Sequence, residues 1–200
     1  MRKATRRGIL AAAIVGLTGT ASYATASSAY ADTNTGVKPK AEKTVPHTYR
    51  VQETSYWCSA ASAQISLSAR DISVDQSELA SYMGVTPDVG LPNIANLRDV
   101  LNDYTGGAGY KVKQWSSDAE LTQKLTEDVI YNVDGGYTVV LNVTRIADAE
   151  FPAGHYAPIV GYRDGGAEFL IADPSNSARQ SIWLSAGDVV GGVKLYRYVA

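Results

Sequence analysis

The sequence predicts an α+β protein, with helices in the first half of the chain and an antiparallel sheet in the second half. Between residues 58 and 104 the chain is rich in helix-forming residues, and apolar side chains recur there at helical spacing. From residue 154 to the end, short β-rich runs are separated by turn signals. Helices followed by a meander of strands are typical of this fold class.

Three helices are predicted in the first half, over residues 58–69, from about residue 75 to residue 84, and over residues 91–104. Thr54 and Ser55 offer hydroxyl groups that could cap the first helix, which contains neither Gly nor Pro. Ser73 and Gln76 have the spacing of a capping box at the start of the second helix. The third helix places its apolar residues on one face and ends before two consecutive glycines.

The remaining elements belong to the predicted sheet and its connections. Their ranges are a strand at 110–115, a helix from 117 to about 131, strands at 137–143, 155–162, 168–172 and 180–184, a helical turn at 185–190, and a strand at 193–199. A further short strand is predicted at 49–51. The turn at 163–166 contains Asp-Gly-Gly, a strong hairpin signal.

Residues 1–31 are predicted to be a signal peptide. Four basic residues precede an apolar run at 9–17, and Ala29 and Ala31 provide a small-residue cleavage site. The apolar run is too short to be a good membrane span, so we expect a secreted protein without a membrane anchor, with an uncleaved anchor as the alternative. Arg6 and Arg7 leave the twin-arginine route open beside the general one. Residues 32–48 read as a flexible leader, which leaves residues 49–200 as the folded domain.

The composition narrows the classes of partner. Without the signal peptide the chain has 14 basic and 20 acidic residues, a net charge of −6, and its basic residues are not clustered among aromatic ones. We therefore do not expect a nucleic-acid partner. We expect the protein to be a monomer. The single cysteine cannot form an internal disulfide, and an unused thiol is a liability outside the cell, so its presence favours a chemical role.

Cys58 stands at the start of the first predicted helix. Unpaired N–H groups and the positive end of the helix dipole favour a thiolate there, and the thiolate is the nucleophilic form of cysteine. Cys58 is therefore a candidate nucleophile. The alternative is a buried cysteine that acts as a small apolar residue.

A cysteine nucleophile needs a base, a group that orients the base, and donors for an oxyanion. The chain has two histidines; we interpret His47 as a surface residue, and His155 begins a predicted strand. Asp173 ends the next strand, so hairpin pairing predicts that it neighbours His155. The alternatives are plain packing for His155 and a turn for Asp173. Gln52 lies six residues before Cys58, and its amide could join the Cys58 N–H as an oxyanion donor.

In this order and spacing, the residues resemble those of papain-like cysteine peptidases. More narrowly, Gln52 with YWCSAA at 56–61, GHYAPIVGY at 154–162 and IADP at 171–174 is similar to the bacteriocin-leader-processing peptidases (peptidase family 39-like) and their stand-alone secreted relatives. The resemblance covers roughly residues 51–198. It implies a papain-like fold, with the cysteine at a helix N-terminus packed on a C-terminal antiparallel sheet.

The resemblance implies a secreted cysteine peptidase that acts on a peptide or protein substrate. Cys58 would be the nucleophile, His155 the acid and base, Asp173 the residue that orients His155, and Gln52 an oxyanion donor. No metal or cofactor is expected. Ser59 and Ala60 replace the Gly and Pro that family members often have after the cysteine.

The substrate cannot be carried over from the best-known family members, which are fused to transporters and cut after a double glycine. We see no transporter domain in the sequence. A transamidase, a cell-wall peptide amidase, and a secreted binding module without catalysis remain alternatives. Tyr56, Trp57 and Tyr156 flank the predicted catalytic pair and could line a substrate cleft or pack in the core.

Overall fold

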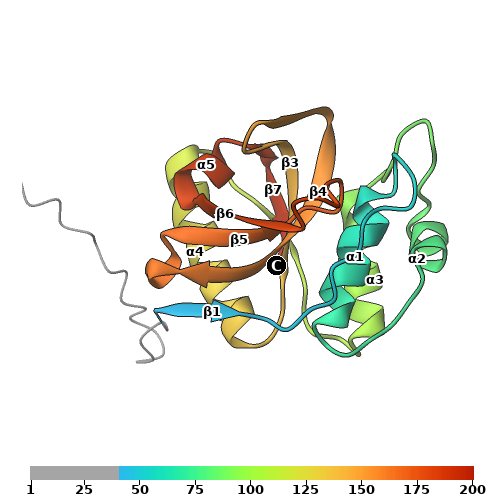
Figure 1. Ribbon diagram of the computed structural model, residues 1–200, viewed down its shortest axis with the longest axis horizontal. Coiled ribbons are helices and arrows are strands. Elements are labelled where there is room, and N and C mark those ends of the chain that lie inside the picture. Colours follow the sequence, from blue (N-terminus) through green and yellow to red (C-terminus); the bar gives the residue numbers. More distant parts are fainter. Residues whose placement is uncertain (1–40) are drawn as a thin grey trace, which may run out of the picture. The chain divides into compact units, whose positions relative to one another are not determined.

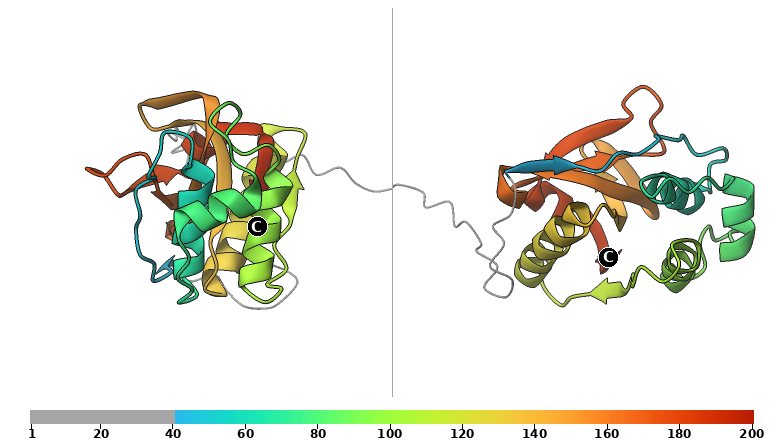
Figure 2. Two further views of the ribbon diagram at one scale, coloured as in Figure 1. Left: turned by 90° about the vertical axis from the view of Figure 1, so that its right-hand side faces the viewer. Right: turned by 90° about the horizontal axis from the view of Figure 1, so that it is seen from below.

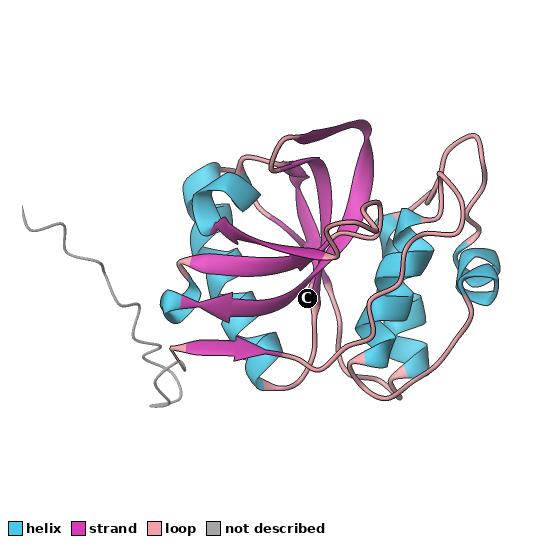
Figure 3. Cartoon of the chain, viewed as in Figure 1, coloured by secondary structure: helices cyan, strands magenta, loops and turns pink. Residues whose placement is uncertain are grey.

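The computed structural model describes residues 41–200, and the predicted signal peptide lies outside this range. The described part contains five α-helices and seven strands, which confirms the predicted α+β class (Figure 3). The helices are α1 Cys58–Ser68, α2 Gln76–Met83, α3 Ile94–Tyr104, α4 Asp118–Asp134 and α5 Ala186–Val190, with a 3₁₀ turn at Asp164–Gly166. The strands are β1 Glu42–Thr44, β2 Val112–Gln114, β3 Val139–Ile146, β4 Ala149–Arg163, β5 Glu168–Ala172, β6 Ser181–Ser185 and β7 Val193–Val199.

The strands form one antiparallel sheet in the order β2-β7-β3-β4-β5-β6. Strand β4 is the longest, and it pairs with β3 along its first part and with β5 along its second part. It begins six residues earlier than the predicted strand, because β3 and β4 stay paired as far as the turn at Ala147 and Asp148. The long β4 carries His155 into the middle of the sheet, where neighbouring strands fix its position.

The structure differs from the predicted flexible leader at residues 42–45. Strand β1 pairs with the end of β4, and Val45 is buried in the core, with its N–H donating to the carbonyl of Val160 at 2.8 Å. Gly161 makes this pairing possible, since a Cβ there would lie 2.8 Å from the Thr44 hydroxyl and 2.9 Å from the Lys43 carbonyl. The segment is polar and has no apolar pattern, so the sequence did not predict this strand, which is held by backbone hydrogen bonds.

Two clusters of buried apolar side chains stabilise the molecule. One lies between the sheet and α4, and the other joins α1, α2 and α3 to residues of β3, β4 and β7. Figure 1 shows the three N-terminal helices gathered beside the sheet, and Figure 2 shows α4 against a different side of the sheet from α1. Helix α1 is buried on almost all sides because its Ala and Ser residues allow close packing. The N-terminal end of α1 lies against the sheet, at the boundary between the two clusters.

Several local predictions were wrong in detail. Residues 49–51 form no strand, since the carbonyl of Val51 accepts from a side chain, that of Gln76, instead of a strand partner. Neither Thr54 nor Ser55 caps α1. Ser73 does not cap α2, whose N-cap position is Asp75, although the helix ends at Gly84 in the left-handed conformation as predicted.

None of the helices in residues 41–200 has the length and apolar character needed to cross a membrane.

Candidate active site

Cys58 is the first residue of helix α1 and is half-buried. No side chain of the described residues caps this helix, and the first bond of its N-terminal turn runs from the N–H of Ala61 to the carbonyl of Trp57. The N–H groups that precede Ala61 therefore have no intrahelical partner, which is the usual state of a first helical turn. They provide a positive partial charge at the Cys58 sulfur.

The position of Cys58 relative to the sheet is set one turn further along α1. The hydroxyl of Ser62 donates to the carbonyl of Tyr156, the neighbour of His155, at 2.8 Å in a buried environment. In the following turn, the hydroxyl of Thr138 donates to that of Ser66 at 2.7 Å. These two bonds fix both the distance and the rotation of α1 against β3 and β4.

His155 and Asp173 are in direct contact, as hairpin pairing predicted. His155 Nε2 lies 2.9 Å from Asp173 Oδ1, and each residue is only 3% exposed. The ring of Phe151 stacks on the imidazole with centroids 4.2 Å apart and planes 13° apart. The ring position of His155 is therefore fixed by a hydrogen bond at its edge and by an aromatic ring on one face.

Cys58 also acts on the imidazole of His155 and favours its protonated form. Burial lowers the pKa of His155, but hydrogen bonds with Asp173 and Cys58, together with the charges of these two residues, outweigh burial and raise the pKa to about 9. For Asp173, burial raises the pKa, yet the hydrogen bonds with His155 and Ser175 prevail and lower it. The charged forms of both His155 and Asp173 are thus favoured at neutral pH.

The loop after Asp173 is tied to the segment before α1. Asp173 Oδ1 accepts from both the N–H and the hydroxyl of Ser175, at 2.9 and 2.8 Å. Tyr49 donates its hydroxyl to the carbonyl of Asp173, and the N–H of Gln52 donates to the carbonyl of Pro174 at 2.9 Å. In Figure 1 the upper end of α1 accordingly lies beside the loop between β5 and β6. All four predicted site residues therefore belong to one connected region.

Gln52 is half-buried and is anchored to the turn that leads into Cys58. Its Nε2 donates to the carbonyl of Thr54 at 2.8 Å, and the same carbonyl accepts from the N–H of Trp57. Its Oε1 is buried without a hydrogen-bond partner. An amide nitrogen carries two hydrogens, so one N–H of Gln52 remains available for a ligand.

Gln76 is a supporting residue whose role the sequence did not reveal. The predicted capping box gave it a local role in α2, but its Oε1 accepts from the N–H of Glu53 and its Nε2 donates to the carbonyl of Val51. Gln76 is 1% exposed. Polar residues of a helix are usually solvated, so only the tertiary structure shows that the side chain of Gln76 binds the backbone on both sides of Gln52. Phe151, Ser62 and Ser175 were missed for the same reason.

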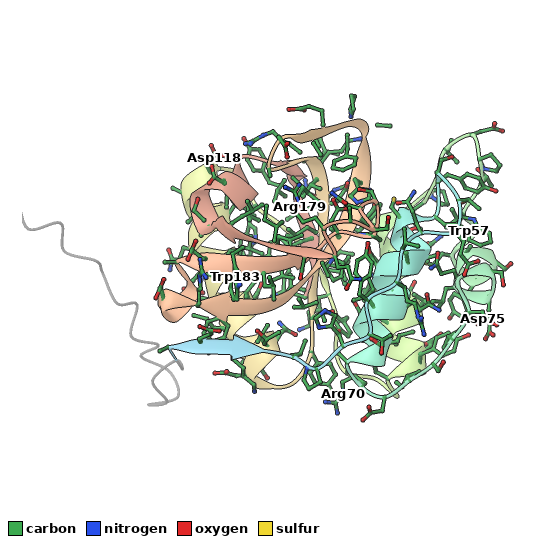
Figure 4. The ribbon with its side chains drawn as sticks, in the orientation of Figure 1. Trp57, Arg70, Asp75, Asp118, Arg179 and Trp183 are labelled. Atoms are coloured by element: carbon green, nitrogen blue, oxygen red, sulfur yellow. The ribbon has the colours of Figure 1, made fainter. Side chains whose placement is uncertain are left out.

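The three aromatic residues proposed for a cleft differ in their surroundings. Tyr156 is 9% exposed and packs in the core cluster of the helices, whereas Tyr56 and Trp57 are half-buried and meet edge to face. Figure 4 shows Trp57 beside α1 and Arg179 in the loop between β5 and β6. A pocket of about 320 Å³ opens between that loop and the β3–β4 turn, and it is lined by Ala149, Asn176 and Ala178 together with the ion pair of Asp148 and Arg179.

In residues 41–200, His, Cys, Asp and Glu side chains do not gather in any group of three or more that could hold a metal ion. The chemistry available at the site is that of a thiol, an imidazole and a carboxylate. A thiol beside an imidazole that is oriented by a carboxylate is suited to nucleophilic attack on a carbonyl carbon.

Comparison with solved structures shows the same fold in bacterial peptidase domains. A double glycine motif protease from an AMS/PCAT transporter, solved with the leader peptide, is 16% identical, with a TM-score of 0.54 over 78% of this chain and 91% of that chain. The peptidase domain of Streptococcus ComA is 12% identical, with a TM-score of 0.54 over 78% and 97%. A putative C39-like peptidase from Bacillus anthracis is 13% identical, with a TM-score of 0.50 over 80% and 96%.

The sequence itself was compared with curated proteins and with protein-family models. No curated protein matches it. The model of the peptidase C39-like family matches residues 43–190, which include every predicted site residue and also Lys43 and Thr44 of strand β1. This chain therefore belongs to the peptidase C39-like family and is a cysteine-type peptidase with a papain-like α+β fold.

Proposed function

We propose that the protein hydrolyses peptide bonds with Cys58 as nucleophile, His155 as general acid and base, and Asp173 as the residue that orients His155. The observation that carries this proposal is that His155 is hydrogen-bonded to Asp173 and that interactions with both Asp173 and Cys58 raise its pKa. With Nε2 donating to Asp173, Nδ1 is the nitrogen left to exchange a proton with the sulfur. This arrangement selects one tautomer and one ring orientation for both steps of the reaction.

In the first step, His155 is already protonated, and the sulfur of Cys58 attacks the substrate carbonyl carbon as a thiolate. The C=O π electrons move to oxygen, and the Cys58 N–H and the free N–H of Gln52 stabilise the resulting oxyanion. His155 then donates its proton to the leaving amine as the C–N bond breaks. An acyl-enzyme thioester and a free amine product result.

In the second step, water replaces the amine. His155 accepts a proton from water as its oxygen attacks the thioester carbonyl, and the same two N–H groups stabilise the second oxyanion. When the C–S bond breaks, the sulfur leaves as a thiolate beside protonated His155. The products are a carboxylic acid and the starting enzyme, so the cycle needs no other reactant than water.

The substrate class that we propose is a peptide or protein segment in an extended conformation. A relative of the same fold was solved in complex with a leader peptide, which supports a peptide as ligand for this fold. Incubation of a peptide library with the protein, followed by mass spectrometry, tests the proposal. We expect hydrolysis products with the wild-type protein and none with Cys58→Ala. Equal hydrolysis by the two proteins, or no hydrolysis by either, would overturn it.

We also propose that the protein is exported and that Asp32 is the first residue of the mature chain. The support is the basic, apolar and small-residue order of residues 1–31. Expression of the full chain in a bacterial host, with mass measurement of the protein from the medium, tests this proposal. A protein that stays in the cells with residues 1–31 attached would contradict it.

A further inference from the structure

Strand β7 contains a large bulge opposite a single residue of β3. Leu141 pairs with Tyr198, and Val143 pairs with Val193, so that Asn142 faces the four residues 194–197. Two residues of the bulge, Leu195 and Tyr196, have φ values of 54° and 52°, in the left-handed region that such side chains rarely adopt. Bulges of this kind re-aim side chains and occur often beside active sites.

The bulge brings Lys194 to the backbone that immediately precedes His155. Lys194 Nζ donates to the carbonyl of Ala153 at 2.7 Å. A Cβ on Gly154 would lie 3.0 Å from Lys194 Nζ and 3.3 Å from Asn142 Oδ1. Lys194 and Asn142 therefore converge on Gly154, and the Oδ1 of Asn142 is buried without a hydrogen-bond partner.

Arg197, at the other end of the bulge, acts on the same aromatic residue as Cys58 does. Burial raises the pKa of Tyr156 to about 12, the charge of Cys58 raises it as well, and the positive charge of Arg197 lowers it. Asn142 pairs with Tyr156 across β3 and β4, so the three side chains belong to neighbouring strand positions. Arg197 and Cys58 therefore both act electrostatically on the side chain of Tyr156, whose neighbour in β4 is His155.

Neither cation of the bulge has an acidic partner. In the part of the chain that the structure describes, no ion pair includes Lys194 or Arg197, and Arg197 Nε is buried without a hydrogen-bond partner. Acidic residues outnumber basic ones in the sequence, so unpaired cations are not a consequence of composition. An unsatisfied buried donor destabilises a protein unless a ligand completes its hydrogen bonding.

We propose that Arg197, with Lys194 beside it, binds a carboxylate of the substrate close to the scissile bond. The ligand is an acidic side chain or the terminal carboxylate of a peptide, and Asn142 Oδ1 accepts an N–H of the same peptide. The inference rests on the proposed function in one respect, since it takes Cys58 as the attacking group. Charge-assisted hydrogen bonds to a guanidinium are the usual means of carboxylate recognition.

Alkylation of Cys58 tests the subsite without requiring peptide hydrolysis. Iodoacetate carries a carboxylate and iodoacetamide does not, and Cys58 is the single cysteine of the chain. We expect the ratio of the iodoacetate rate to the iodoacetamide rate to fall about tenfold in Arg197→Gln, the size expected for one partly solvated charge-assisted bond. Arg197→Lys retains the charge and should keep most of the ratio. Arg98→Gln, which removes an arginine already paired with Asp99, should keep the wild-type ratio.

Matched peptides identify the source of the carboxylate. Peptides that differ only by Glu or Gln at each position around the scissile bond, and peptides with a free or an amidated C-terminus, separate a side chain from a chain end. A preference for the carboxylate in kcat/KM that disappears in Arg197→Gln supports the subsite. If peptides are hydrolysed without such a preference, and the alkylation ratio does not change in Arg197→Gln, the subsite proposal is overturned. The peptidase proposal is then unaffected. If the alkylation ratio falls in Arg197→Gln but no peptide is hydrolysed in a way that requires Cys58, the subsite is supported and the proposed function is overturned.

Discussion

The side-chain amide of Gln76 holds the backbone on both sides of Gln52. Gln76 Oε1 accepts from the N–H of Glu53 at 3.0 Å, and Gln76 Nε2 donates to the carbonyl of Val51 at 2.8 Å. A buried residue of α2 thereby fixes the segment that carries the proposed oxyanion donor. The two glutamines have separate roles, one towards the substrate and one towards the fold.

Substitution of the two glutamines should have different effects. Gln52→Ala removes a donor that acts on the transition state, so we expect kcat to fall by about 10² to 10³ with little loss of stability. Gln76→Ala breaks three hydrogen bonds of a buried side chain, to the backbone of residues 51 and 53 and to Gln64, so we expect the free energy of unfolding to fall by about 2–3 kcal/mol. Urea denaturation and steady-state kinetics measure both quantities. Gln123→Ala, on the exposed face of α4, is the control that should change neither.

Equal losses of stability in the Gln52 and Gln76 variants would contradict this division. So would a kcat of Gln52→Ala within about twofold of the wild-type value, because an oxyanion donor contributes more than that.

The bond between Ser62 and the carbonyl of Tyr156 predicts a positioning role for Ser62. In Ser62→Ala, α1 loses its bond to the strand that carries His155, and we expect kcat/KM to fall about tenfold because small displacements of a nucleophile are costly. Ser66→Ala is the matched control, since it breaks the equivalent bond to Thr138 one turn away. Both variants should lose about 1–2 kcal/mol of stability. A fall in kcat/KM that is equal in the two variants would assign Ser62 to stability alone.

The pH dependence of activity should show an alkaline limb near the pKa of His155. Burial lowers this pKa, but the interactions with Asp173 and Cys58 raise it to about 9, from 6.5 for a free histidine. Since protonated His155 donates to the leaving amine, kcat/KM should fall as the pH rises through about 9. The stability that protonation contributes should be fully present below pH 6.5 and should be lost as the pH rises through about 9.

Asp173→Asn tests the cause of that limb. An amide lacks the carboxylate charge that favours the imidazolium, so the alkaline limb of kcat/KM should move to lower pH. A profile that does not move would show that Asp173 does not set the protonation of His155.

Regular pairing made part of the fold predictable. Strand β5 has the predicted bounds because its apolar residues pack in the core, and β7 has them because its β-rich run begins after two glycines. The contact of His155 with Asp173 follows from the short turn between β4 and β5, since antiparallel pairing brings the residue after β5 back beside His155, although the register shifts once between Ile159 and Gly161. These features depend on local sequence alone.

The supporting residues depend on tertiary contacts and were not predictable. Strand β1 is polar, and only a close approach to Gly161 reveals it. Gln76 has the sequence context of a helix start, whereas its partners are residues 51 and 53. The bulge of β7 has the residue pattern of an ordinary strand, because backbone conformation at Leu195 and Tyr196 leaves no signal in the sequence.

The coupling of Cys58 to His155 is the central claim, and the rate of alkylation of Cys58 tests it most directly. We predict that iodoacetamide modifies the wild-type protein at pH 7 much faster than it modifies a small model thiol, because a protonated imidazole beside a thiol favours the reactive form of sulfur. In His155→Ala the rate should fall to that of the model thiol. A wild-type rate equal to that of the model thiol, or one that His155→Ala leaves unchanged, would contradict the proposed mechanism.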